Sequence, residues 1–228
     1  MNAERRLQTM FSVRIASTLL EAMTLAAIEA YCYGEKPGRK WKPVETLGYT
    51  WGFKKADSAA TVIYLDRMSL SISSTRAHKS VQPNPEAQRL KNEVMARWSP
   101  HLSMLGDFHT HPYRNLTELK DHRGFDFSPE DFAHFLADDF IWQQSGGNPV
   151  MLVIAICRMD RVRANAGRRL RSNICHYAVG EFGFWINAVA GFTNEAGARQ
   201  HTGNRNSKTT LDIDLWPYNP ARDRMQSE

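Results

Sequence analysis

The chain has 228 residues, of which 42% are hydrophobic and 11% aromatic, so it can bury a core and is not a disordered protein. That length fits one domain with elaborations. No apolar run approaches the ~20 residues that span a bilayer, and the charged start MNAERRLQTM gives no sign of a signal peptide. The net charge of +5 suits an acidic protein partner or a nucleic acid without choosing between them.

The three cysteines, Cys32, Cys157 and Cys175, are an odd number and form no CxxC pair. Reduced thiols are typical of the cytoplasm, whereas secreted proteins tend to pair their cysteines in disulfides. We therefore expect a cytoplasmic protein without a disulfide framework.

The first expected helix covers residues 12–33, because apolar side chains recur there at steps of three and four and Gly34 provides a natural end. Two strand-like pieces follow, VETLGYTWGF at 44–53 and ATVIYLDRMSL at 60–70. The second piece is apolar enough to be a buried strand.

A second helix is expected at residues 84–100, with Asn84 as its N-cap and Pro85 at the first helical position. One face of this helix carries the apolar residues Ala87, Leu90, Val94 and Trp98. The sequence then predicts a strand, LSMLGDFHTH, at residues 102–111.

A third helix is expected to begin after Ser128, which is followed by a proline, and to end at Gly146. The continuous apolar run at 150–159 predicts a central strand. Beyond it, two strand-like pieces flank a turn at 165–167, and LDIDLW at 211–216 alternates like an edge strand. Because helices interleave with apolar strands, the sequence indicates an α/β (α+β) architecture.

The stretch GDFHTHP places two histidines, His109 and His111, at alternate positions of an expected strand. Alternate strand residues project to the same face, so the two imidazoles can converge on one point. A catalytic zinc usually has three protein ligands and a fourth position for water. An HxH pair alone is more often a packing or surface pair, so a third ligand has to come from elsewhere.

The candidate third ligand is Asp131, three residues after Ser128 at the start of the third expected helix. Helix capping alone would explain both residues, because an acidic first turn after a serine cap is common. A candidate general base is Glu45, at the start of a strand-like piece. Taken by itself, Glu45 would be an ordinary exposed glutamate.

Three motifs of this chain resemble those of the JAMM (MPN+ or JAB) metalloprotease family: P-x-E-x-x-G-x-x-x-G, H-T-H-P and S-x-x-D. Their order and their neighbouring secondary-structure elements resemble the family as well. The matching residues are Pro43, Glu45, Gly48, Gly52, His109, Thr110, His111, Pro112, Ser128 and Asp131. The resemblance covers roughly residues 12–160 and implies a JAB/MPN-type mixed β-sheet flanked by helices. Residues 161–228 would be a C-terminal elaboration of the same single domain.

The resemblance implies a zinc isopeptidase in which His109, His111 and Asp131 bind Zn²⁺. Glu45 would then be the general base, and Ser128 would help to hold the oxyanion of the tetrahedral intermediate. The implied substrate is a ubiquitin-like protein, released from a lysine or trimmed of an extension beyond its C-terminal glycine.

The chain looks like bacterial deubiquitinase-like members of the family. Those members accompany E1-like and E2-like proteins in conjugation operons, some of them tied to phage defence. E1-like and E2-like proteins are therefore the partners that the resemblance implies, together with the ubiquitin-like protein and its conjugates.

One departure from the family is the sixteen-residue segment 112–127 between the second histidine and Ser128, which is much longer than the family's usual spacing. It contains three possible substitute ligands, Asp121, His122 and Asp126. Asp131 is preferred because it alone lies on a helix with a capping serine three residues earlier. We expect the insertion to shape or gate a substrate groove.

Three other interpretations remain open at this point. A JAMM-like domain can be a non-catalytic MPN-like scaffold in a conjugation complex. An HxH motif also occurs in amidohydrolases and phosphoesterases, although those usually need a barrel of about 250 residues. The segment 158–171 holds six arginines and one aspartate, but it lacks the interleaved aromatic residues of single-strand binders, which argues against nucleic acid.

Overall fold

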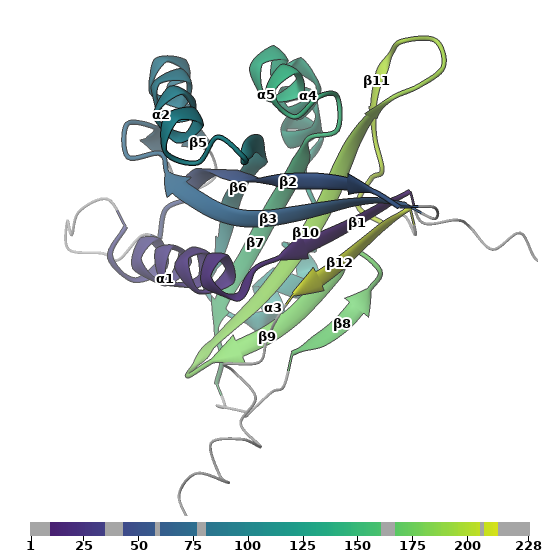
Figure 1. Cartoon of the computed structure of the whole chain (residues 1–228). Helices are drawn as coiled ribbons and strands as arrows, with labels where there is room; N and C mark the ends of the chain where they lie inside the picture. The colour runs from purple at the N-terminus through teal and green to yellow at the C-terminus, as the bar shows by residue number, and fades with distance from the viewer. Residues whose placement is uncertain are drawn as a thin grey trace, which may run out of the picture.

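The computed structural model describes residues 10–34, 43–57, 60–76, 81–160, 167–205 and 208–213 (Figure 1). The helices are α1 (Ser17–Tyr33), α2 (Pro85–Trp98), α3 (Leu116–Asp121), α4 (Pro129–Ala137) and α5 (Asp139–Gln144). The strands are β1 (Phe11–Ile15), β2 (Leu47–Ala56), β3 (Thr61–Leu70), β4 (Thr75–Arg76), β5 (Val81–Gln82), β6 (Ser103–Tyr113), β7 (Val150–Arg158), β8 (Arg168–Arg171), β9 (Ile174–Val179), β10 (Phe182–Thr193), β11 (Arg199–His201) and β12 (Thr209–Ile213).

Ten of these strands form one mixed sheet, in the order β12-β1-β3-β2-β6-β7-β10-β9-β8, with β11 paired to β10. Strand β1 runs parallel to β3 and β12, and β6 runs parallel to β7, whereas the other pairs are antiparallel. The sheet curls, with helices on both faces (Figure 1). The expected α/β class and mixed sheet flanked by helices are therefore confirmed.

Strand β7 is the central strand that the apolar run predicted, and its residues 150–157 are all buried. Alternate side chains of β7 enter different layers. Val150, Leu152, Ile154 and Ile156 pack in one cluster with α1, whereas Met151 and Val153 pack with α4 and α5. The neighbouring strand β6 shares this alternation through its parallel register with β7.

The prediction that the first helix begins at residue 12 is wrong, because residues 11–15 form strand β1. Phe11, Val13 and Ile15 are buried in alternation, and the strand lies between β3 and β12. Helix α1 begins only at Ser17. The apolar residues of 12–15 fit both a helical and an alternating pattern, and the distant partner strands decide between them.

The helix expected between Ser128 and Gly146 is divided into α4 and α5 at Asp138. The Asp138 backbone leaves the helical region, with φ −74° and ψ 83°, and its carboxylate accepts the N–H of Ile141 at 2.9 Å. An aspartate can cap a new helix in this way and so end the previous one. Helix α3, inside the 112–127 insertion, was not predicted.

Helix α2 begins as expected, since the Asn84 side chain accepts the N–H groups of Glu86 and Ala87 at 3.0 and 3.2 Å. Its apolar face, however, does not enter the core, because Leu90 and Trp98 are 62% and 80% exposed. The buried residue is Gln88. This helix therefore packs on the protein through another side, which carries Gln88 and the partly buried Met95.

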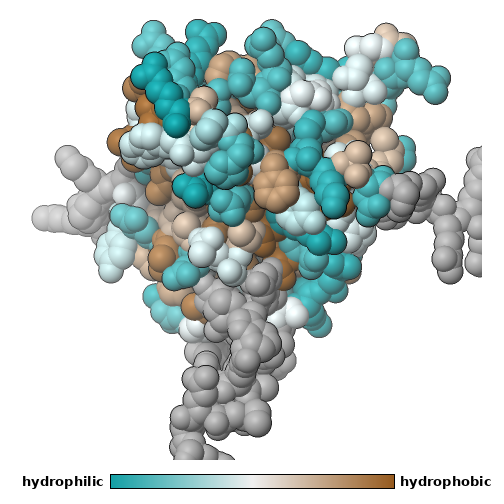
Figure 2. All heavy atoms as spheres, viewed as in Figure 1, coloured by the Kyte–Doolittle hydropathy of each residue, from teal (hydrophilic) through white to brown (hydrophobic). Residues whose placement is uncertain are grey.

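Some predictions fall outside the described residues: the turn at 165–166, the end of the expected strand at 214–216, and the tail at 217–228. Within the described residues, no helix is long and apolar enough to cross a membrane. The face seen in Figure 2 is largely hydrophilic, with smaller apolar areas between the polar side chains.

Candidate metal centre

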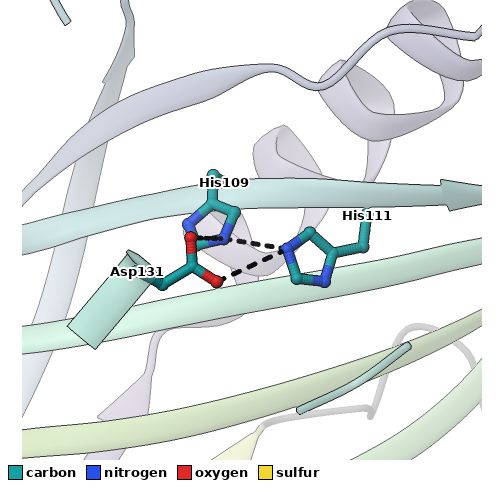
Figure 3. A group of neighbouring side chains, drawn as sticks. All are labelled: His109, His111 and Asp131. Atoms are coloured by element: carbon teal, nitrogen blue, oxygen red, sulfur yellow. Dashed lines mark hydrogen bonds and ion pairs between the residues drawn. The ribbon is translucent and has the colours of Figure 1, made fainter. Parts of the chain in front are cut away.

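Two strand residues and one helix residue meet at the predicted site (Figure 3). The Nε2 atoms of His109 and His111 lie 3.1 Å apart. The Asp131 carboxylate oxygens lie 3.5 Å from Nε2 of His109 and 3.9 Å from Nε2 of His111. The ligand atoms of the three side chains all lie within 4.8 Å of one another, which is close enough to share one metal ion. A search of the described residues for such groups of histidine, cysteine and acidic side chains gives this group.

The two histidines project from β6 because of strand alternation and their register with β7. His109 and His111 lie opposite Val153 and Ala155, two of the β7 residues that face α3, α4 and α5. Both imidazoles therefore point to the side of the sheet from which the helical connection between β6 and β7 returns.

Asp131 is held by a capping box at the start of α4. The Asp131 N–H donates to Oγ of Ser128 at 3.1 Å, and the Ser128 N–H donates to Oδ2 of Asp131 at 2.8 Å. The interpretation as a cap was therefore correct, but it does not exclude a ligand role. The other carboxylate oxygen, Oδ1, is the one nearest His109.

His111 is oriented by the 112–127 insertion. Its Nδ1 lies 2.8 Å from the carbonyl oxygen of Gly124, which can only accept a hydrogen bond. Nδ1 therefore carries the proton and Nε2 keeps its lone pair. This is the usual arrangement of a metal-binding histidine, whose second nitrogen donates to a carbonyl or carboxylate.

The charges at the site favour the forms that bind a cation. Burial, followed by the nearby His109, lowers the pKa of His111 to about 4, so its imidazole is neutral. Burial raises the pKa of Asp131, but the hydrogen bond and charge of His109 outweigh that effect and hold the pKa below its usual range. Burial lowers the pKa of His109, and Asp131 reverses this and raises it. A cation that replaced this ion pair would release the His109 proton.

Glu45 lies beside this group and is only 8% exposed. The following residue, Thr46, forms two hydrogen bonds with Thr110, between the two histidines: its N–H donates to Oγ1 at 2.9 Å and its carbonyl accepts the Thr110 N–H at 3.0 Å. Burial raises the pKa of Glu45 to about 7, with His109 lowering it and Asp131 raising it. A carboxyl group with such a pKa can both take and give a proton at neutral pH.

All five sequence-predicted site residues line one cleft of about 600 Å³. They are Glu45, His109, His111, Ser128 and Asp131. The three substitute ligands do not join them. The Asp126 carboxylate pairs with Arg205 at 3.1 Å, His122 stacks on Tyr113 with ring centroids 6.3 Å apart, and Asp121 is exposed at the end of α3.

Sequence reasoning missed two acidic residues that line the same cleft, Asp107 and Asp138. Burial raises the pKa of Asp107 to about 7, and its Oδ1 has no hydrogen-bond partner among the described residues. Its position two residues before His109 could have revealed it, because residues 107, 109 and 111 share one strand face. No sequence pattern indicated that Asp138 would line the cleft, because its position there depends on the unpredicted break between α4 and α5.

The donor set fits a divalent cation. Two imidazole nitrogens and one carboxylate oxygen are the ligands that zinc accepts in catalytic sites, where a fourth position is left for water or substrate. The neutral His111 and the ionised Asp131 are ready for binding, and Gly124 supplies the outer hydrogen bond that such sites use.

A scan against protein-family models found no match to this chain, and a search of curated proteins found no relative. What this site does must therefore be inferred from its residues and their geometry.

Proposed function

We propose that this protein is a zinc-dependent metallopeptidase of the JAMM type. Its substrate would be an amide bond after the C-terminal glycine of a ubiquitin-like protein, joined to a lysine amine or to a linear extension. The observation that carries the proposal is the convergence of Glu45, His109, His111 and Asp131, which come from three separate motifs, in one cleft.

Zinc is the metal that we propose for this ligand set. Magnesium and calcium prefer oxygen ligands, whereas two imidazoles and one carboxylate are a common catalytic zinc set. His109, His111 and Asp131 would hold the ion. A zinc ion bound there would polarise the scissile carbonyl and make water nucleophilic at neutral pH.

Glu45 acts in this proposal as the proton carrier. As water attacks the carbonyl carbon, the Glu45 carboxylate takes a proton from it and returns that proton to the leaving amine nitrogen. The C–N bond breaks, leaving a carboxylate on one product and an amine on the other. A carboxyl pKa of about 7 suits both halves of this task.

Ser128 has a second task in addition to capping α4. Its oxygen accepts the Asp131 N–H, but a hydroxyl group can accept one hydrogen bond and still donate its own proton. Because Ser128 lines the cleft, that proton is available for the oxyanion of the tetrahedral intermediate.

The nature of the substrate rests on the resemblance of the three motifs to the JAMM family. The same resemblance supports E1-like and E2-like partners and a link to antiviral defence, whereas the expected cytoplasmic location rests on the cysteine pattern of the sequence. The cleft geometry supports hydrolysis of an amide bond without selecting the modifier protein.

The test uses a panel of ubiquitin-like proteins, each linked after its C-terminal glycine to a lysine side chain or to a linear peptide reporter. We expect zinc-loaded wild-type protein to release the reporter from at least one of them. Glu45→Gln should lower the rate by about 10²- to 10⁴-fold while zinc content stays unchanged. His109→Ala should lose both zinc and activity.

Glu130→Gln is the matched control, because Glu130 is an exposed glutamate that lines the same cleft directly before Asp131 in the chain and is not a member of the group of three candidate ligands. This control should cleave like the wild type. Equal cleavage by wild type, Glu45→Gln and His109→Ala would show that the proposal is wrong.

A further inference from the structure

Residues 124–128, which we call the ligand-holding segment, contact all three candidate metal ligands. The carbonyl of the first residue accepts the His111 imidazole N–H at 2.8 Å. The phenyl ring of the fourth residue packs edge-on against the His109 ring, with centroids 5.9 Å apart. The last residue caps the helix of Asp131. The geometry of the metal site therefore depends on where this segment lies.

Two asparagines from the C-terminal third of the chain hold this segment. Oδ1 of Asn204 accepts the Phe127 N–H at 2.8 Å, and Nδ2 of Asn204 donates to the Phe127 carbonyl at 2.9 Å. Nδ2 of Asn187, on β10, donates to the Phe125 carbonyl at 2.9 Å. The amide of Asn204 thus pairs with both backbone groups of one residue, as a neighbouring strand would.

The two asparagine side chains are themselves fixed by a polar network. Nδ2 of Asn187 also lies 3.3 Å from Oδ1 of Asn204, and Oδ1 of Asn187 accepts from Nδ2 of Asn173 at 2.7 Å. Asn173 and Asn187 are fully buried. Buried amides in such a network are costly to leave unpaired, so the orientation of each side chain is strongly specified.

We propose that Asn204 and Asn187 are positioning residues of the metal centre, which fix the ligand-holding segment and so pre-organise His111 and Asp131 for the cation. The inference rests on the metal site of the proposed function. It assigns the C-terminal third of the chain a part in metal binding, although Asn187 on β10 and Asn204 in the turn after β11 are not ligands themselves.

The chemistry of the amide explains why asparagine is needed at residue 204. The side-chain amide offers, on one short planar group, both the acceptor for the Phe127 N–H and the donor for the Phe127 carbonyl. Leucine has a similar size and offers neither group. Aspartate can accept the N–H bond, but it places a second oxygen against the carbonyl.

The test measures cobalt binding, because Co²⁺ commonly replaces zinc and its visible absorption reports the ligand geometry. The full chain is titrated with Co²⁺, and zinc affinity is measured by competition with a chelator. We expect Asn204→Leu and Asn204→Asp to weaken binding by up to about 10- to 100-fold, the range seen when a hydrogen bond to a ligand itself is lost, because a displaced segment would disturb the Gly124 bond to His111 and the cap at Asp131. The cobalt spectrum should also change.

Thr202→Val is the matched control. Thr202 is buried beside the same strands, and its hydrogen bonds go to Ala190 and, at 2.7 Å, to Thr209. This variant should lose thermal stability and keep the wild-type affinity and spectrum. If both Asn204 variants bind metal like the wild type, or if Thr202→Val loses as much affinity, the inference is wrong.

Metal binding and peptidase activity can fail separately. Wild-type binding with the expected loss in the Asn204 variants, but without cleavage of any ubiquitin-like substrate, would overturn the proposed function alone. Cleavage by the wild type with unchanged metal affinity in the Asn204 variants would overturn only the positioning role.

Discussion

Glu45, Asp107 and Asp131 share one cleft, yet their environments move their pKa values in opposite directions. Burial raises the pKa of Glu45 and Asp107 to about 7, whereas His109 holds the pKa of Asp131 low. Neighbouring carboxyl groups with separated pKa values are the usual way in which one site obtains both a proton carrier and a permanent anion. The cleft therefore has an ionised ligand next to a carboxyl group that can exchange protons.

His176, which lies outside the cleft, should make the stability of the folded protein depend on pH. Burial, followed by the charge of Arg168, lowers the pKa of His176 to about 4, and neither ring nitrogen has a hydrogen-bond partner among the described residues. Between pH ~6.5 and ~4 the unfolded chain binds this proton and the folded chain does not. Stability should therefore fall as the pH drops through this window, by up to about 3 kcal/mol from this residue.

Denaturant unfolding at pH 7 and pH 5 measures this effect. In His176→Phe, the part of the pH dependence due to this imidazole should disappear, so the variant should lose less stability than the wild type between the two values. An identical loss in both proteins would contradict the lowered pKa.

The apolar face of helix α2 is exposed, so substitutions on its two faces should change the free energy of unfolding by different amounts. Asn92 donates to Oε1 of Gln144 at 3.0 Å and accepts from Nε1 of Trp51 at 3.2 Å, so Asn92→Leu should cost roughly 1–3 kcal/mol by leaving these groups unpaired. Leu90→Gln and Trp98→Gln should each stay within about 0.5 kcal/mol of the wild type, because both side chains are exposed.

Urea unfolding of the three variants decides between two packings of α2. If Leu90→Gln and Trp98→Gln are strongly destabilised and Asn92→Leu is not, the apolar face of the helix is buried after all.

The sequence could predict those elements that local chemistry determines. The Asn84 and Ser128 caps, the buried β7 and the strand carrying the histidines are all found as expected. The start of α1 and the packing face of α2 could not be predicted, because they depend on partners far away in the chain. Strand β1 exists because β3 and β12 flank it, and the Asn92 side of α2 faces inward because it finds polar partners there.

The residues of the candidate site could be predicted from motifs, but the residues that hydrogen-bond to the site from elsewhere in the fold could not. Strand periodicity and a capping pattern allow His109, His111 and Asp131 to lie together, but the resemblance of the three motifs to the JAMM family is what selects them. The residues that hold them in place, Gly124 and Asn204, follow no local rule, since each acts through a hydrogen bond across the fold.

At the scale of the whole molecule, metal binding should stabilise the folded state. A ligand that binds only the folded protein adds about 2.7 kcal/mol at one hundred times its dissociation constant. For a chain of this size, that corresponds to a rise in Tm of roughly 5–10 °C. Thermal unfolding with added Zn²⁺, and then with a chelator in excess, should show this rise and its reversal.

His109→Ala is the control for this experiment, because it removes a ligand and should abolish the zinc-dependent rise. An equal rise in the wild type and in this variant would place the stabilising ion elsewhere.

The parallel pairing of β6 and β7 has a last consequence. Two of the three candidate ligands lie on a strand inside the sheet, whereas the third lies on the connection that crosses back to β7. Partial opening of that connection would reduce the number of protein ligands from three to two while the sheet remained intact. Retention of a bound ion would thus depend on the local order of this connection, and the affinity for the ion could change without any loss of the hydrophobic interior.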